Sequence, residues 1–170
     1  MSLLALLPFP IIMAWAAASD LFTMRIPNAL VLALAFFFVI AALAANLSLA
    51  AFGLHLLAGF IVLVAGFAFF ALRWIGGGDA KLAAATALWL GLADGVLLRY
   101  VVYAGVLGGA LTLLLLVFRN LPLMPFIARH DWIGRLHDKK TGVPYGVALA
   151  LAGLIAFAGS PLFLRLYGFA

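Results

Sequence analysis

The feature that most constrains the fold is the length of the uncharged segments. The 47 residues between Arg25 and Arg73 contain no Lys, Arg, Asp or Glu, and residues 1–19 and 100–118 are also free of them. A helix needs about 20 consecutive apolar residues to cross a bilayer. The longest segment therefore predicts two membrane helices joined by a turn near 46–48. A water-soluble fold is excluded, because too little polar sequence exists to cover one.

The composition agrees with one membrane-embedded domain covering residues 1–170. Apolar residues make up 69% of the chain and charged residues 9%, and the mean hydropathy is +1.31. We expect the lipid bilayer as a partner and no nucleic acid, because the basic residues lie where membrane topology places them. Cysteine is absent, which excludes disulfides and thiolate metal sites. We predict no metal and no cofactor.

The charge pattern predicts an all-α, polytopic membrane bundle of six transmembrane helices with both termini outside. The expected spans are 1–19, 29–46, 54–72, 79–94, 95–118 and 141–164. Two basic residues, Arg99 and Arg165, fall outside, and the other eight fall on the cytoplasmic side, as the positive-inside rule requires. These eight are Arg25, Arg73, Lys81, Arg119, Arg129, Arg135, Lys139 and Lys140. A cleaved signal peptide is the alternative for residues 1–19, but a basic n-region is missing.

Three smaller features complete the predicted topology. The fourth span is short, and we expect the other helices to bury it. The polar loop 119–140 places Trp132 and Leu136 at helical spacing, which predicts a helix lying on the membrane surface. His55 has no partner at ligand spacing, so we interpret it as an interfacial residue at the outer end of the third span.

The candidates for chemistry are two of the five acidic residues. Asp20 ends the first apolar block, and Asp79 ends a glycine run at the mouth of the fourth span. The predicted topology puts both at the same membrane face, although 59 positions separate them. Two neighbouring carboxylates share a proton, so that one activates water while the other polarises a scissile carbonyl. We predict aspartyl peptide hydrolysis with Asp20 and Asp79 as the catalytic residues.

Two further segments are candidate substrate-binding elements. Gly76, Gly77 and Gly78 carry no side chains, so their backbone can approach an extended peptide closely. Tyr145 lies in the segment Val143–Gly146 at the start of the last span, where we expect it to border the same site.

Structural roles and other function classes remain open beside this hypothesis. Asp79 is also well placed as a helix N-cap, and Asp20 as a surface partner of Arg25. Lys81 is interpreted as a topology anchor and not as a catalytic group. A small ion-coupled transporter would use intramembrane aspartates as a proton relay. A noncatalytic assembly subunit would need neither carboxylate.

Three ordered motifs resemble those of the type IV prepilin peptidases. They are the GxGD tetrad 76–79 continued as Ala80-Lys81-Leu82, the aspartate Asp20 upstream of Ile26-Pro27-Asn28, and the segment 143–146. The likeness is best to the short, peptidase-only members that serve tight-adherence (Flp-type) pilus systems. Presenilin-type enzymes share GxGD, but their partner aspartate follows a tyrosine. Asp20 follows Ser19, which favours the prepilin branch.

The resemblance implies a bacterial inner-membrane aspartic endopeptidase. Such enzymes remove the basic leader from prepilins and pseudopilins at the cytoplasmic membrane face. Asp20 and Asp79 match the catalytic aspartates, and Gly76 and Gly78 match the tetrad glycines. Larger members add an N-terminal region, often with zinc-binding cysteines, and methylate the new N-terminus. With no cysteine and an early first span, we expect neither the zinc site nor methyl transfer. The particular prepilin and the oligomeric state stay open.

Overall fold

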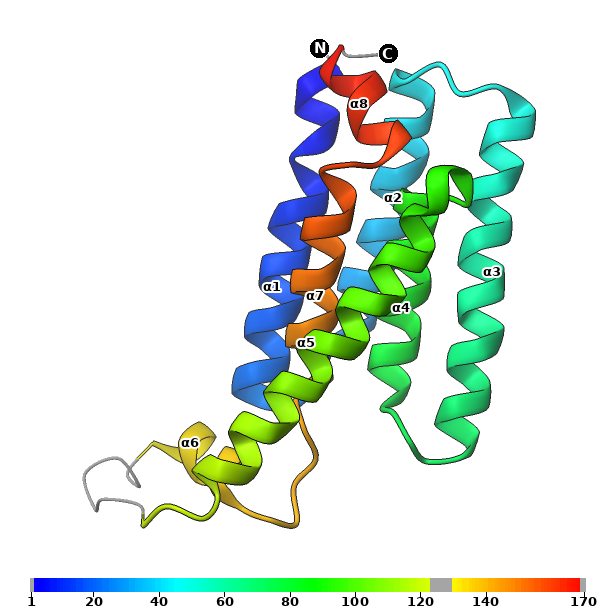
Figure 1. Ribbon diagram of the computed structural model, residues 1–170. Coiled ribbons are helices and arrows are strands. Elements are labelled where there is room, and N and C mark those ends of the chain that lie inside the picture. Colours follow the sequence, from blue (N-terminus) through cyan, green and yellow to red (C-terminus); the bar gives the residue numbers. More distant parts are fainter. Residues whose placement is uncertain (1, 123–129, 169–170) are drawn as a thin grey trace.

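The computed structural model describes residues 2–122 and 130–168, and this described part is a bundle of helices without strands (Figure 1). The elements are the 3₁₀-helix η1 (Ser2–Leu6), α1 (Pro8–Thr23), α2 (Asn28–Ala44), α3 (Leu49–Ala71), α4 (Gly77–Leu90), the 3₁₀-helix η2 (Ala93–Gly95), α5 (Val96–Phe118), α6 (Asp131–His137), α7 (Tyr145–Phe157) and α8 (Pro161–Tyr167).

The long helices alternate in direction, and the two chain termini lie at the same end of the bundle (Figure 1). The end of α1 and the start of α4 therefore meet at the opposite end, together with α6 and the loop that contains it. Arg129, one of the basic residues predicted on the cytoplasmic side, lies outside the described residues.

Three helical segments of the described chain are long and apolar enough to cross a membrane: Leu4–Thr23, Leu49–Ala71 and Ala93–Phe118. A fourth candidate is the pair α7 and α8, if the two count as one span. The helix α2 is apolar but has only 17 residues. These lengths confirm an all-helical membrane protein with three to four clear spans, while the six-span topology and its orientation stay predictions.

The last predicted span, 141–164, is not one straight helix. The axes of α7 and α8 differ by 55°. Ser160 begins α8, and its hydroxyl accepts a hydrogen bond from the Phe163 N–H at 3.2 Å. Pro161 occupies the first turn of α8, where the missing N–H of proline costs nothing. The Gly159-Ser160-Pro161 sequence therefore interrupts an apolar segment that hydropathy alone treats as continuous.

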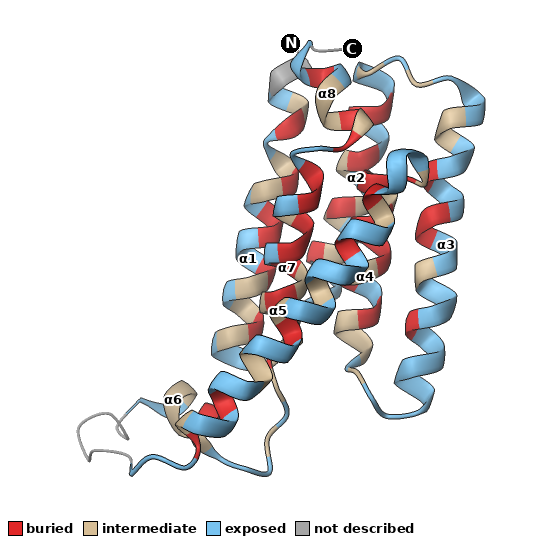
Figure 2. Cartoon of the chain, viewed as in Figure 1, coloured by how far each residue is buried: buried red, intermediate tan, exposed pale blue. Residues whose placement is uncertain are grey.

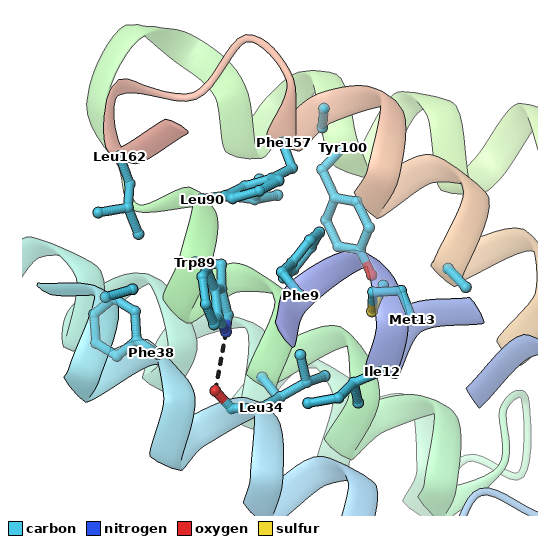
Figure 3. Close-up of a cluster of buried hydrophobic side chains, with 14 of the residues drawn as sticks. Phe9, Ile12, Met13, Leu34, Phe38, Trp89, Leu90, Tyr100, Phe157 and Leu162 are labelled. Carbon is cyan, nitrogen blue, oxygen red and sulfur yellow. Dashed lines mark hydrogen bonds between the residues drawn. The ribbon is translucent and has the colours of Figure 1, made fainter. Parts of the chain in front are cut away.

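An aromatic cluster joins α1, α2, α4 and α7 in the core (Figure 3). The Trp89 ring on α4 is fully buried, and its centroid lies 5.2 Å from that of Phe9 and 5.6 Å from that of Phe157. The Trp89 indole N–H donates to the Leu34 carbonyl of α2 at 2.9 Å. Because a buried indole N–H needs an acceptor, this hydrogen bond fixes α4 against α2.

The central helix of the bundle is α4, which is short and largely buried, whereas α3 and α5 expose long apolar faces (Figure 2). Glycines on α3 allow close packing with α4. A Cβ atom added at Gly66 would lie 3.0 Å from the Ala80 Cβ, and one at Gly59 would lie 2.5 Å from Leu88 Cδ2. Small residues at such contacts are typical of helix pairs in membranes. The expected burial of the short fourth span is confirmed.

The interpretation of His55 as an interfacial side chain was wrong, because only 7% of the residue is exposed. The Nδ1 atom lies 2.6 Å from the Leu88 carbonyl oxygen, and the ring packs against Gly91. His55 therefore joins α3 to the end of α4. No group of three His, Asp or Glu side chains suited to a metal ion occurs in residues 2–122 and 130–168.

The predicted helix in the polar loop corresponds to α6, which packs against the end of α1. The Trp132 ring meets the Phe22 ring edge-on at 5.1 Å, and the Arg135 guanidinium donates to the Phe22 carbonyl. Arg119 at the end of α5 is buried, and its guanidinium donates to the carbonyl oxygens of Leu136, Thr141 and Gly142. These contacts hold the loop beneath the helices that carry the candidate site.

Candidate active site

Asp20 lies in the last turn of α1 and is 6% exposed. Its Oδ2 atom accepts a hydrogen bond from the Gly146 N–H at 2.7 Å. That amide belongs to the first turn of α7, where backbone N–H groups have no partner within the helix. A helix start that donates to a carboxylate is a favourable electrostatic arrangement, so α7 both binds and orients Asp20.

Beyond Asp20, α1 ends in a turn that directs the chain across the site. Met24 closes the helix in the left-handed conformation, with φ at 55°. The Ser19 hydroxyl donates to the Arg25 carbonyl at 2.8 Å, and the Thr23 hydroxyl donates to the same oxygen at 3.3 Å. The segment that follows, Ile26-Pro27-Asn28, is thereby fixed between α4 and α7.

Asp79 lies in the first turn of α4 and is only partly buried. Gly76 is the N-cap, so the predicted N-cap role of Asp79 shifts by three positions. The Asp79 Oδ2 atom accepts the Gly76 N–H at 3.1 Å, which is the carboxylate half of a capping box. The glycine run 76–78 leads into this turn, as the sequence predicted.

Asp20 and Asp79 line one cavity of about 510 Å³. The glycine run forms one side of this cavity, and residues 24–28 form the other. The structure therefore brings together both predicted catalytic residues and all three glycines predicted to bind substrate. Met24 and Arg25 also line the cavity, and no sequence motif assigned either residue to the site.

Ile26 connects the three sequence motifs. A Cβ atom added at Gly78 would lie 3.2 Å from the Ile26 Cβ, and one added at Gly146 would lie 2.8 Å from the Ile26 Cδ1. The same added atom at Gly146 would lie 2.8 Å from the Asp20 Oδ2. Glycine is thus required for close approach at position 146. The sequence predicts no separate role for Gly146 beyond its place in the segment 143–146, because glycine carries no functional group.

Tyr145 is not among the described residues that line the cavity, although it directly precedes Gly146, which binds Asp20. Its hydroxyl is 3.1 Å from the Thr112 hydroxyl on α5, and its ring covers Gly108. The structure therefore shows Tyr145 joining α7 to α5, and its role in substrate binding stays a prediction.

Asn28 and Lys81 form a hydrogen bond at the edge of the cavity. The Lys81 ammonium donates to the Asn28 Oδ1 at 3.1 Å, which joins α4 to the start of α2. Pro27 occupies the N-cap position of α2, and no side-chain cap bond forms there. Lys81 is interpreted in the sequence as a topology anchor, and the structure adds this contact.

The arrangement defines a class of protein: an integral membrane protein of helices with two carboxylates facing one cavity at the end of the bundle. A model of the type IV leader peptidase family matches residues 7–169, and the chain belongs to that family. Membership indicates a peptidase that acts on prepilin leaders in a membrane setting. Comparison with curated proteins and with solved structures gives no match.

Proposed function

We propose that the chain is an aspartic endopeptidase that cleaves the basic leader from type IV prepilins or pseudopilins. The reaction takes place at the cytoplasmic face of a bacterial inner membrane, and the catalytic groups are Asp20 and Asp79. The observation that carries the proposal is that two acids 59 positions apart line one cavity beside a run of three glycines.

In the proposed mechanism the two carboxyl groups share one proton and hold a water molecule between them. The ionised carboxylate removes a proton from the water, whose oxygen attacks the scissile carbonyl carbon. The protonated carboxyl group donates its proton to the carbonyl oxygen, which gives a neutral tetrahedral intermediate. The carboxyl group that is now protonated gives its proton to the leaving amine, while the other carboxylate takes a proton from a hydroxyl of the intermediate. The C–N bond breaks, the carboxylic acid product forms, and the pair again holds one proton.

Backbone hydrogen bonds to the two carboxyl groups support this mechanism. Each carboxyl group has one oxygen, Oδ2, bound to an amide of the protein at Gly146 or Gly76. These bonds orient the side chains before substrate binds, which reduces the reorganisation that the reaction requires. The glycines at 76–78 leave room for a substrate strand at the open side of the cavity.

The experiment is co-expression with a candidate prepilin whose basic leader ends in glycine before an apolar helix. We expect Asp20→Asn and Asp79→Asn each to lower the cleavage rate by about 10²–10⁴-fold, the range for loss of a general acid or base. Asn keeps an acceptor for each backbone amide, so the fold should persist. The readout is the mass of the processed pilin, with membrane insertion measured in parallel.

Asp94→Asn is the matched control, because Asp94 is exposed in the turn between α4 and α5. It should cleave at the wild-type rate. Wild-type cleavage by inserted Asp20→Asn and Asp79→Asn variants would exclude the peptidase mechanism and favour a noncatalytic assembly subunit.

A further inference from the structure

An apolar groove of about 500 Å³ lies beside α4, between α2 and α3. One wall is formed by Val31 and Ala35 of α2, and the other by Phe60 and Leu63 of α3. Ala84 of α4 contributes to the floor. The groove opens to the side of the bundle, where a bilayer would place lipid.

The groove exists because α2 and α3 meet at one end and diverge toward the other. They meet near their connecting turn, where the Phe38 ring stacks on Phe52 with centroids 5.6 Å apart. Farther along, both helices pack on α4 and not on each other, because Gly59 brings α3 close to Leu88. The small side chains of α4 leave the space between the walls unfilled.

A second pocket lies between the groove and the cavity that holds the two aspartates. This pocket of about 190 Å³ between α3 and α4 shares Leu63 and Lys81 with the groove and shares Gly77 with the aspartate cavity. Lys81 lies at this junction, where it donates to Asn28. The shared residues therefore place the end of the groove next to Gly77 and the glycine run.

We propose that this groove binds the apolar helix of the substrate that directly follows the cleaved peptide bond. The inference rests on the proposed function and specifies where the uncut substrate lies. A peptide bond next to a membrane helix reaches Asp20 and Asp79 only if that helix binds beside the cavity. The groove can bind an apolar helix there, because its lining is apolar apart from Lys81 at the cavity end.

The geometry sets the length and direction of the contact. Leu88 lies eleven positions after Gly77 on α4, a rise of about 16 Å at 1.5 Å per residue, so about three turns of substrate helix fit beside this stretch. Phe67 lines the pocket near the cavity, and Phe60 lines the far part of the groove. Phe67 should contact the substrate close to the cut, and Phe60 about seven residues farther along.

Crosslinking tests this register directly, because the natural chain contains no cysteine. Single variants Phe67→Cys and Phe60→Cys, in an Asp79→Asn background that leaves substrate uncut, are co-expressed with the candidate prepilin. The prepilin carries one cysteine, moved stepwise along its apolar helix. Oxidation should crosslink Phe67→Cys to early positions and Phe60→Cys to positions about seven residues later.

The matched controls are Ile61→Cys on α3 and Leu32→Cys on α2, which are 46% and 69% exposed, lie outside the groove lining and are turned away from it on their helices. Both should give little or no crosslink. Equal crosslinking at the control positions, or no shift between Phe67→Cys and Phe60→Cys, would overturn the proposal.

A cleavage assay provides an independent measurement. Ala35→Trp should fill the groove and raise the KM for the prepilin at least about tenfold, whereas Leu32→Trp on the same helix should cleave normally. If the wild type cleaves the prepilin and Ala35→Trp has the same KM as Leu32→Trp, the groove proposal is wrong and the peptidase proposal stands. If the inserted wild type does not cleave the prepilin, both proposals are wrong. If Ala35→Trp does not insert into the membrane, the crosslinking positions decide the groove proposal.

Discussion

Asp20 and Asp79 line the same cavity but are held in different ways. Asp20 is almost fully buried, and its partner Gly146 is 126 residues later in the chain. Asp79 is less buried and binds Gly76, three residues earlier in the same turn. One position is therefore set by the packing of α7 against α1, and the other by a local helix cap.

The difference predicts which substitutions displace each carboxyl group. A change in α7, or in the loop that leads to it, should displace Asp20 while Asp79 keeps its place. A change in the glycine run should act on Asp79 through a contact that can readjust. The positions of the two acids therefore differ in how well they tolerate substitutions nearby, even though the proposed reaction needs both acids equally.

Among changes to the groups that position the two acids, the largest effect is expected for Gly146→Ala. The new Cβ atom would lie 2.8 Å from the Asp20 Oδ2 and 3.0 Å from the Asp20 Cβ, so the side chain must move as a whole. Because a shift of about 1 Å at a catalytic group costs about a hundredfold in rate, we expect a loss of that size. The measurement is prepilin cleavage at equal amounts of inserted protein.

Gly142→Ala is the control for this prediction, since its Cβ atom would meet nothing within 4 Å. It should cleave within about twofold of wild type, in line with the small effects of unconstrained surface changes. Near-normal cleavage by Gly146→Ala would show that Asp20 is not positioned by α7, and the comparison between the two acids would fail.

An intermediate effect is expected for Arg119→Gln. The guanidinium holds the segment before α7 through bonds to the Leu136 and Gly142 carbonyls at 2.8 Å and to the Thr141 carbonyl at 3.0 Å. Each bond from a charged donor contributes about 1.5–3 kcal/mol. We expect easier proteolysis of the loop, a lower melting temperature and about tenfold slower cleavage.

Lys139→Gln serves as its control, because Lys139 lies in the same loop and donates only to the exposed Asn120 side chain in the described contacts. It should change neither proteolysis nor cleavage measurably. If Arg119→Gln loosens the loop yet leaves cleavage unchanged, the position of Asp20 does not depend on this loop.

The smallest effect is expected for Gly76→Ala. Its Cβ atom would lie 2.9 Å from the Asp79 Oδ2, but the next nearest atom is 3.7 Å away. The Gly76 backbone, at φ −73° and ψ 149°, suits any L-residue. A small rotation of the carboxylate relieves the contact, so we expect cleavage within about fivefold of wild type. If Gly76→Ala lowered the cleavage rate more than Gly146→Ala does, Asp79 and not Asp20 would be the acid more sensitive to a change at its glycine partner.

Much of this arrangement could be predicted from where charges interrupt apolar segments. The breaks at Asp20, Arg73 and Lys81 locate the helix ends, and the alternation of direction then places both aspartates at one end. The role of Gly146 could not be predicted, because it consists of a backbone amide and a missing side chain. The bend at Ser160 was missed because hydropathy outweighed a Gly-Ser-Pro signal that is typical of a helix start.

Some side-chain roles depend on packing that no pattern in the sequence specifies. His55 has no charged neighbour in sequence, and only the close approach of α3 to α4 shows that it is buried against Leu88. Asn28 resembles a helix cap, yet its amide oxygen binds Lys81, 53 residues later. Both residues are polar groups whose partners come from a different helix.

The length of α4 has a consequence for the supply of water. Its 14 residues rise about 21 Å, whereas the hydrocarbon layer of a bilayer is about 30 Å thick. Because other helices and not lipid surround α4, the missing length is not matched by the bilayer but leaves the cavity of about 510 Å³ beyond the Asp79 end. This recess in the protein can hold solvent beside the carboxylates.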